Sequence, residues 1–425
     1  QCGPGMGSVS QIGWEWYTRL AARTSVTLVT HSRNRTAIEQ TGWLGSGSDI
    51  LFVDTEWFAG PLYRLATRLF PRSPHATFLL SSLDFFVYDY IAERKLRQRW
   101  GRGERWDVVH AVTPVSPVAA TRLYRLGAPL VLGPWNGGLG VLPAFKEIMR
   151  QDASWVYPLR YLGRLADAWT GTTRHAAMIL TATRATQTTL PASHQPQCVS
   201  MLENGVDLAT FTPSLWPEAP SATQPLRLVF VGRLAPFKAL PLLLKALAQL
   251  CREFPVQLTV LGDGPLAQTW RQDARDLGVA ECVDFRGACA AAEVAEYLRR
   301  SHVLCLPSVR ESGGAVLLEA MACARPVIVV AFGGPAEVVD DAVGCAIAPI
   351  SPQSVVEAFA HTFRDIVQHP DVWRQRGEEG RRRAEQRYSW EMKIEQALGW
   401  YQHLLAQTSV SARSDLFSRL QWEGS

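Results

Sequence analysis

From Leu226 onward, the chain alternates short, mostly apolar runs with longer amphipathic stretches. Apolar runs of this kind are typical of strands that are covered on both faces, and the stretches between them repeat their apolar residues at the helical period. We expect strands at 226–231, 257–261, 283–285, 303–306 and 326–330, and helices at 241–254, 266–277, 291–300 and from Ala315. This order predicts an α/β fold built on a parallel sheet.

The first half of the chain shows the same rhythm less cleanly, with strand candidates at 26–30, 108–112, 129–132 and 178–181. Between the halves, 211–221 is rich in Pro and Ser and has no periodicity, which indicates a linker. A chain of 425 residues exceeds what one hydrophobic core usually serves. We therefore expect two doubly wound domains, 1–211 and 212–387, with ligands bound in a cleft between the carboxyl ends of their sheets.

A Gly-rich loop at 2–10 leads into a helical stretch at 11–22. Such a loop normally follows a strand, and no strand precedes this one. The first strand is typically central in a doubly wound sheet. We therefore expect the N-terminal sheet to lack its first strand, unless another segment takes that place.

The composition of the chain argues against several classes of protein. The net charge is only +4, which gives no general case for nucleic-acid binding. Eight cysteines are scattered without a C-x-x-C pair, so we interpret them as reduced core residues. No run approaches the roughly 18 apolar residues of a membrane span, and the start of the sequence lacks the features of a secretion signal. These patterns predict a cytoplasmic location.

The segment 311–321 carries the clearest functional signal. Two carboxylates, Glu311 and Glu319, flank the pair Gly313 and Gly314, directly after an apolar run. We expect a strand, then a loop with Glu311, then a helix that begins after the glycines. Free amides at a helix start favour a phosphate, and carboxylates accept hydrogen bonds from sugar hydroxyls. The combination indicates a nucleotide-sugar; the alternative is that both acids are ordinary solvent-exposed residues.

Several segments in series resemble the C-terminal half of a retaining glycosyltransferase of family 4, the group 1 glycosyl transferases, which have a GT-B fold. The segments are 231–234 with Lys238, 261–266, 285–287, 306–308, 311–319, 324–328 and 333–337. Their order and spacing match the family over roughly 199–400. The first half resembles the family more loosely, through its Gly-rich loop, 106–110 and 133–138. The resemblance implies that the first domain holds the acceptor, that the second holds the donor, and that a helix at 388–406 crosses back onto the first domain.

The second domain is expected to provide the donor site. Arg233 and Lys238 follow its first strand, where two cations can stabilise a departing diphosphate; an exposed basic loop is the alternative. By resemblance, Glu319 accepts both ribose hydroxyls and Glu311 contacts the transferred sugar. The remaining expected donor-site residues are Gly232, Gly262, Gly313, Gly314, Ala315, Val316 and Glu337, the last of which could equally be a helix-start acid.

In the first domain, His110 ends a strand where the family often has a His, and a satisfied core histidine is an equal alternative. Many family members place a sugar-contacting His where this chain has Trp135. A Trp cannot perform proton chemistry, so we expect Trp135, with Asn136 and Gly137, to stack on a sugar face or to shape the acceptor site.

The Gly-rich loop has its own expected role. Gly5, Met6 and Gly7 offer backbone amides to the donor from across the cleft, or they form a plain strand-to-helix turn.

No Asp-x-Asp pair occurs in the chain, so we expect no bound metal and no cofactor apart from the nucleoside diphosphate sugar as co-substrate. A basic stretch from Arg94 to Arg105 includes Leu96 and Trp100. It is either a solvated helix face or, as in family members that glycosylate lipid-linked acceptors, a peripheral contact with anionic membranes.

The expected activity is therefore transfer of a sugar from a nucleoside diphosphate sugar, UDP- or GDP-linked, to a hydroxyl acceptor with retention of configuration. The acceptor is a glycan, a lipid-linked saccharide or a small molecule. By the family mechanism, the departing diphosphate takes the acceptor proton. Two alternatives stay open. A nucleotide-sugar epimerase of the same architecture would isomerise its donor without an acceptor, and a catalytically silent domain would bind sugar without transferring it.

Overall fold

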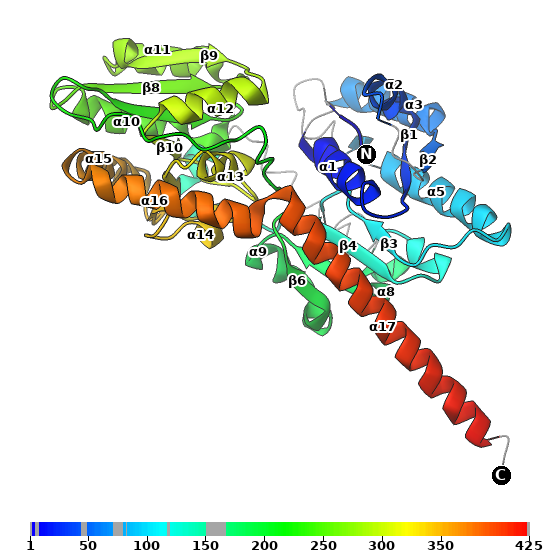
Figure 1. Ribbon diagram of the computed structural model, residues 1–425. Coiled ribbons are helices and arrows are strands. Elements are labelled where there is room, and N and C mark those ends of the chain that lie inside the picture. The colour runs from blue at the N-terminus through cyan, green and yellow to red at the C-terminus, as the bar shows by residue number, and fades with distance from the viewer. Residues whose placement is uncertain are drawn as a thin grey trace. The chain divides into compact units, whose positions relative to one another are not determined.

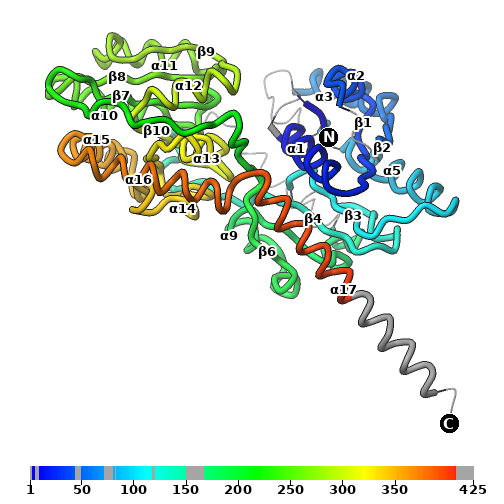
Figure 2. The backbone as a smooth tube through the Cα atoms, in the orientation of Figure 1, coloured from blue at the N-terminus to red at the C-terminus, as the bar shows by residue number. Residues whose placement is uncertain are grey.

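The computed structural model describes residues 2–4, 8–43, 49–70, 80–81, 83–116, 120–149 and 167–422, with side chains to 407 (Figures 1 and 2). Its residues form two compact units. The first comprises 1–137, 155–203 and 393–425, and the second comprises 138–154 and 204–392.

The second unit contains a six-stranded parallel sheet in the order β12-β11-β10-β7-β8-β9. Its strands are β7 (Leu226–Val231), β8 (Val256–Leu261), β9 (Val283–Gly287), β10 (Val303–Leu306), β11 (Val327–Val330) and β12 (Gly344–Ile347). Its helices are α6 (Lys146–Met149), α10 (Leu240–Leu250), α11 (Ala267–Asp276), α12 (Ala291–Arg300), α13 (Ala315–Ala322), α14 (Pro335–Val338), α15 (Pro352–Gln368) and α16 (Pro370–Arg383). All five strands predicted in this half are confirmed. The edge strand β12, with Ile347 as its one large apolar residue, was not predicted.

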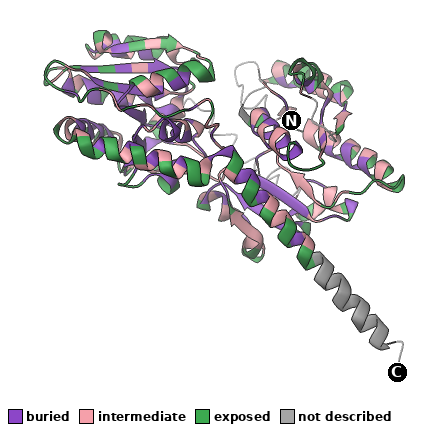
Figure 3. Ribbon diagram, in the orientation of Figure 1, coloured by how far each residue is buried: buried purple, intermediate pink, exposed green. Residues whose placement is uncertain are grey.

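The strands β10 and β11 are apolar and buried along their whole length, because both faces of the sheet are covered there. Leu228 and Phe230 of β7 pack into the main core with α10 and α15, and Val229 between them is fully buried as well. Successive side chains of a strand point to opposite faces. Figure 3 shows buried residues along the central strands of this sheet and many exposed residues along α16. Continuous apolar runs in the sequence therefore correspond to a sheet between two helical layers.

The first unit contains two separate parallel sheets. One pairs β1 (Thr27–His31) with β2 (Asp49–Val53), and the other has the order β3-β4-β5-β6. The strands of the second sheet are β3 (Val109–Ala111), β4 (Leu130–Trp135), β5 (Met178–Thr181) and β6 (Cys198–Ser200). The helices are α1 (Ser8–Ala21), α2 (Arg35–Gln40), α3 (Glu56–Leu69), α5 (Asp84–Gly101), α8 (Thr172–His175), α9 (Arg184–Gln187) and α17 (Trp390–Trp422), which enters the unit at Lys393. We predicted one sheet here, and the structure divides it between β1 and β3.

The unit boundaries differ from the predicted division at 211/212 and 387/388. Residues 204–211 belong to the second unit, where the amide of Val206 donates to the Tyr388 carbonyl at 2.9 Å and Arg381 donates to the Phe211 carbonyl at 3.0 Å. The segment 138–154 also belongs there, because Phe145 and Met149 are buried in its core. The assignment of acceptor binding to the first unit and donor binding to the second stays a prediction.

None of the helices within the described ranges has the length and apolar character that a membrane crossing requires.

His302 predicts a pH dependence of stability. Its Nδ1 accepts from the Arg227 amide at 2.8 Å and its Nε2 donates to the Glu218 carbonyl at 2.9 Å, which fixes a neutral ring. Burial lowers the pKa of His302 from 6.5 to about 4. The unfolded chain therefore binds a proton more readily than the folded one between these values, and stability falls as pH falls through this window.

We expect His302 to account for about 3 kcal/mol of lost unfolding free energy between pH 7 and pH 4. Urea unfolding of the wild type and of His302→Gln at several pH values measures this. The Gln variant should be less stable at pH 7 and should show a shallower acid slope. If the unfolding free energy of the wild type and of His302→Gln fell equally steeply with decreasing pH, His302 would not be the cause of the pH dependence.

Candidate functional site

In the second unit, the loops that follow β7 and β8 lie against each other at the carboxyl edge of the sheet. The Gly232 amide donates to the Leu261 carbonyl and the Leu234 amide donates to the Asp263 carbonyl, both at 2.9 Å. Gly262 has φ +129, and a Cβ there would lie 2.0 Å from the Gly232 carbonyl oxygen. Only glycine permits this approach and this backbone conformation. The two predicted glycines, Gly232 and Gly262, thus fix the contact between the loops.

Lys238 and Glu311 form an ion pair at this edge. Lys238 ends a short 3-10 turn after β7, and Glu311 lies in the loop after β10. The distance from Lys238 Nζ to Glu311 Oε2 is 2.5 Å, and their side chains are 11% and 13% exposed. The Val309 amide donates to the Phe237 carbonyl at 2.9 Å, which holds the two loops together. The fold thus joins a predicted phosphate-binding cation and a predicted sugar-binding acid, which are far apart in sequence.

The start of α13 presents backbone amides beside this pair. Gly314 has φ +56 and immediately precedes the helix, whose first amides have no intrahelical acceptor. The Gly334 amide donates to the Glu311 carbonyl at 3.1 Å, so the loop after β11 supports the loop after β10. A Cβ on Gly334 would lie 1.9 Å from the Ser312 carbonyl oxygen. The predicted loop-to-helix transition at Ala315 is confirmed, and the amides of Ala315 and Val316 lie in its first turn.

Glu319 lies in the second turn of α13 and is half-buried. Among the described residues its carboxylate has neither a hydrogen bond nor an ion pair. Burial raises the pKa of Glu319 from 4.5 to about 7, because the charged form loses solvation without gaining a partner. A half-buried acid without a partner in its own protein is suited to accept hydrogen bonds from a ligand.

Two other predicted donor-site residues are exposed to solvent. Arg233 is exposed, and its guanidinium has no ion pair within the part of the chain that the structure describes. Glu337, in α14, is exposed and has a partner in its own protein. The sequence analysis also missed Ser308, which follows β10 and is buried, and whose hydroxyl has no hydrogen-bond partner among the described residues. The run 306–308 was recognised as a family motif, but nothing in it indicated an unpaired hydroxyl.

In the first unit, both nitrogens of His110 are occupied. Nε2 donates to the Gly133 carbonyl at 2.7 Å, so Nδ1 accepts from the Tyr401 hydroxyl at 2.6 Å. The Trp16 ring packs edge-on at 4.9 Å. Burial lowers the pKa of His110 to about 4. These contacts are those of a satisfied core histidine, and a catalytic role for His110 stays a prediction.

The last residue of β4 and the two residues after it are held by contacts within their own unit. Trp135 is 2% exposed and packs in the core of the β3–β6 sheet, so stacking on a sugar would require this burial to change. The Asn136 amide side chain donates to Glu203 Oε1 at 2.9 Å. The Gly137 carbonyl accepts from Thr186 at 2.9 Å. Gly5, Met6 and Gly7 lie outside the described residues.

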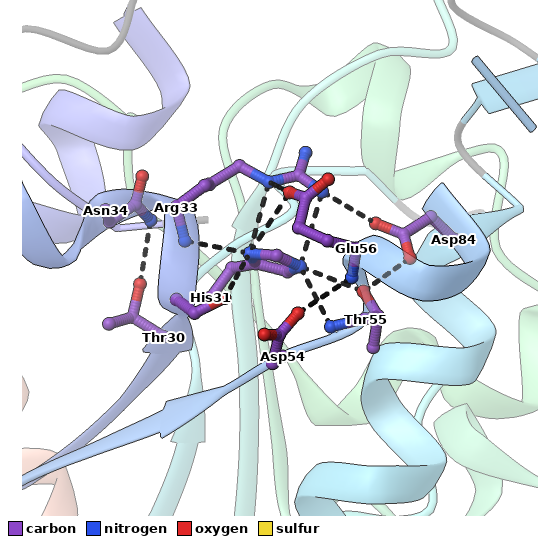
Figure 4. Close-up of polar contacts among 9 residues, drawn as sticks. Thr30, His31, Arg33, Asn34, Asp54, Thr55, Glu56 and Asp84 are labelled. Carbon is purple, nitrogen blue, oxygen red and sulfur yellow. Dashed lines mark hydrogen bonds and ion pairs between the residues drawn. The ribbon is translucent and has the colours of Figure 1, made fainter. Parts of the chain in front are cut away.

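A polar cluster at the carboxyl ends of β1 and β2 was not predicted (Figure 4). His31 Nε2 and Thr55 Oγ1 are 2.9 Å apart, and Thr55 donates to Asp84 at 2.6 Å. The Arg33 amide donates to His31 Nδ1 at 3.0 Å, and the Arg33 guanidinium lies 3.0 Å from Glu56. Burial, followed by the Arg33 charge, lowers the pKa of His31. The sequence offered one clue to this cluster, which is the position of its residues: His31 ends one strand and Thr55 closely follows the next strand.

Within the described ranges, no three His, Cys, Asp or Glu side chains cluster as metal ligands would. All eight cysteines are free thiols.

Comparison with known proteins finds a family similar to the second unit. The family described as glycosyl transferases group 1 matches residues 216–383. These residues are therefore similar to the group 1 glycosyl transferases. The match covers the Lys238–Glu311 pair, the start of α13 and Glu319.

Curated relatives include the D-inositol 3-phosphate glycosyltransferases of Kineococcus radiotolerans and Streptomyces bingchenggensis. The first is 32% identical over 52% of this chain and 55% of its own length, and the second is 33% identical over 46% of each. The chain therefore spans about half the length of the curated relatives that it matches.

Solved structures show that the fold is GT-B. Sucrose-phosphate synthase from Thermosynechococcus elongatus has a TM-score of 0.64 at 19% identity and covers 94% of each chain. Anabaena Alr3699/HepE, solved in complex with UDP and glucose, has a TM-score of 0.58 at 18% identity, covering 94% of this chain and 98% of its own. The GT-B fold predicted from the family resemblance is confirmed.

Proposed function

We propose that this protein transfers a sugar from a nucleoside diphosphate sugar to a hydroxyl acceptor with retention of configuration, as a family 4 glycosyltransferase. The observation that carries the proposal is the Lys238–Glu311 pair beside the amide-rich start of α13. A fixed cation, free amides and a carboxylate in one place match the charges and hydroxyls of such a donor. The match of the second unit to the group 1 family supports the same activity.

Each donor group has a proposed contact. Lys238 and Arg233 bind the diphosphate, and the amides at the start of α13 donate to it. Glu319 accepts from the ribose hydroxyls, for which its unpaired carboxylate is suited. Glu311 contacts the transferred sugar, and Lys238 holds this acid in position in the absence of donor.

In the proposed reaction, the acceptor oxygen bonds to the anomeric carbon as the bond from that carbon to the diphosphate breaks. The acceptor proton passes to the departing diphosphate oxygen on the same face, so no protein base is needed. Lys238 and Arg233 stabilise the growing charge more strongly than the ground-state charge, which is what lowers the barrier. We propose that these cations act without a metal ion.

The acceptor is assigned to the first unit, with Asn136, Gly137 and the His31 cluster as its proposed contacts. We place the reaction in the cytoplasm, with the basic stretch from Arg94 to Arg105 as the proposed membrane contact. Part of this stretch is already paired, since Arg99 bridges Glu104 and Asp49. The unpaired cations of the stretch would have to provide the attraction to an anionic surface.

Thermal unfolding with nucleoside diphosphates tests the donor site. UDP is the first to examine, because Anabaena Alr3699/HepE was solved with it. At a concentration of 100 times Kd, UDP or GDP should raise the midpoint by roughly 5–10 °C. Glu319→Ala should remove this shift, because the ribose loses its acceptor. Glu357→Ala, an exposed acid on α15, should leave it unchanged.

Two further outcomes decide the proposal. Product analysis should show a glycosylated acceptor, whereas a new donor isomer formed without acceptor would indicate an epimerase. Equal shifts for wild type and Glu319→Ala, or no shift with any nucleoside diphosphate, would contradict the donor site.

A further inference from the structure

The carboxyl ends of β4, β5 and β6 form an ordered edge of the four-stranded sheet. In this sheet β5 lies between β4 and β6. The Ala182 amide, after β5, donates to the Trp135 carbonyl at 2.7 Å, and the Met201 amide, after β6, donates to the Thr181 carbonyl at 2.9 Å. Each of these segments thus stays attached to the end of the neighbouring strand. Ligands of parallel sheets bind at this edge, so side chains fixed here are candidates for contacts with the acceptor.

Asn136 and Glu203 meet at this edge. Asn136 is the first residue after β4, and Glu203 is the third residue after β6. The side-chain nitrogen of Asn136, Nδ2, donates to Glu203 Oε1 at 2.9 Å. The backbone around Asn136 is fixed as well. Its amide donates to the Val115 carbonyl at 2.9 Å, and the carbonyl of Gly137 accepts from the Thr186 hydroxyl at 2.9 Å.

Glu203 is itself held inside the unit. It is 2% exposed, and its second oxygen, Oε2, has no hydrogen-bond partner among the described residues. Lys393 of α17 is 3% exposed and donates to the carbonyl of Leu202, next to Glu203. Burial lowers the pKa of Lys393 to about 7, and the charge of Glu203 opposes this shift, so the cation and the carboxylate stabilise each other. Such a carboxylate offers Asn136 only hydrogen-bond acceptors.

This carboxylate decides which way the Asn136 carboxamide faces. A carboxamide has a donor nitrogen on one side and an acceptor oxygen on the other. Because an ionised carboxylate only accepts, Nδ2 must face Glu203 and Oδ1 must take the other side. Asn136 is half-buried, and no described residue donates to its Oδ1. An acceptor oxygen fixed at this edge matches a hydroxyl, whereas a phosphate or a carboxylate has no proton to give it.

We propose that Glu203 is a positioning residue for the sugar acceptor. It orients Asn136 so that Oδ1 accepts a hydrogen bond from a neutral hydroxyl of the acceptor, such as that of a sugar or another polyol. The inference rests on the proposed function, which assigns the acceptor to the first unit. It adds the kind of group that Asn136 binds, and it gives Glu203 a role although Glu203 does not touch the acceptor.

The orientation can be measured in the free protein, because the chain has three asparagines, Asn34, Asn136 and Asn204. In protein labelled with ¹⁵N-asparagine, the side-chain signals that disappear in Asn136→Ser belong to Asn136. Their protons should exchange with solvent roughly tenfold more slowly than those of Asn204, which is half-buried and has no side-chain hydrogen bond among the described residues. Glu203→Gln should remove most of this protection, because its amide also donates and lets the carboxamide turn over. Equal exchange at Asn136 in the wild type and in Glu203→Gln would overturn the proposal.

Sugar transfer tests the consequence for the acceptor. The donor is UDP-glucose, and the acceptors are the neutral compounds methyl α-glucoside, methyl α-mannoside and myo-inositol, of which the one that the wild type uses best is kept. Glu203→Gln and Asn136→Asp should each lower kcat/KM for this acceptor by about 3- to 10-fold, mostly through its KM. This is the size of effect expected for one hydrogen bond between neutral groups. Glu39→Gln, which changes an exposed acid on α2, should leave the kinetics unchanged.

The double variant Glu203→Gln/Asn136→Asp makes the test specific, because it exchanges the two groups. The amide at position 203 now donates to the carboxylate at position 136, whose second oxygen again faces the acceptor. Its kcat/KM should return to within about threefold of the wild-type value. A double variant that loses as much as the two single variants together would overturn the proposal. A change in the KM of UDP-glucose in place of the acceptor KM would do so as well.

Failure of the proposed function would look different. The wild type would then glycosylate none of the acceptors and UDP would not raise its unfolding midpoint, whatever the exchange rates at Asn136. That result would overturn the proposed function and, with it, the acceptor role of Asn136. Thermal unfolding checks that each variant folds. If Glu203→Gln does not fold, the wild-type comparison of Asn136 with Asn204 decides, and equal exchange at these two side chains would overturn the inference.

Discussion

Replacing Lys238 with alanine should lower kcat/KM for sugar transfer by about 10- to 150-fold. This range corresponds to the roughly 1.5–3 kcal/mol that one hydrogen bond to a charged group contributes. Lys238 would contact the diphosphate as its charge grows, so most of the loss should appear in kcat. Removal of Lys238 also leaves Glu311, which is 13% exposed, without its partner. Steady-state kinetics with a saturating acceptor measures the effect.

Lys245→Ala is the matched control, because Lys245 is an exposed lysine on α10 of the same unit. It should leave both kinetic constants unchanged. The double variant Lys238→Ala/Glu311→Ala shows whether the two residues act together. If they do, the loss of kcat/KM in the double variant differs from the sum of the losses, in free energy, in the two single variants. An unchanged kcat/KM in Lys238→Ala would remove this residue from the catalytic proposal.

Replacing Arg325 with methionine should lower the unfolding free energy by roughly 3–5 kcal/mol. Arg325 is fully buried and donates to carbonyls of two distant segments, 214–215 and 298–299, and to that of its neighbour Ala324. The acceptors are the carbonyls of Ser214, Leu215, Leu298, Arg299 and Ala324 and the hydroxyl of Ser214. Methionine fills a similar volume but removes all of these hydrogen bonds. Urea unfolding followed by tryptophan fluorescence measures the loss.

Two companion variants make the Arg325 result specific. Arg325→Lys should recover little of the lost unfolding free energy, because a single ammonium cannot reach acceptors arranged around a planar guanidinium. Arg364→Met removes an exposed arginine paired with Glu253 and should change stability little. A loss in Arg325→Met no larger than in Arg364→Met would contradict the structural role.

The sequence predicted the second unit well because its signals are local. The strands β7 and β10 begin at Leu226 and Val303 as expected, and the helix after Gly314 begins at Ala315. An apolar run covered on both faces and a glycine before a helix are visible within a few residues. The first unit was predicted less well, because its strands are short and its sheet is divided.

Residue environments were harder to predict than elements. His110 and Trp135 were considered for chemistry at the acceptor site, yet both lie among side chains of their own unit. The His31 cluster was missed because His31, Thr55 and Asp84 come from separate elements. Arg325 stood in a recognised motif, but its acceptors were not visible in that motif.

By itself, the sequence determined the alternation of strands and helices, the position of the glycine turns and the resemblance of the second unit to the group 1 glycosyl transferases. These depend on patterns within short stretches, where periodicity and backbone freedom act directly. The tertiary structure alone decided that Lys238 pairs with Glu311 and that β1 and β3 border one cavity. It also decided that Glu319 has no partner among the described residues and that burial raises its pKa to about 7. Pairing and burial depend on which segments, far apart in the sequence, come into contact, and local sequence patterns do not predict these contacts.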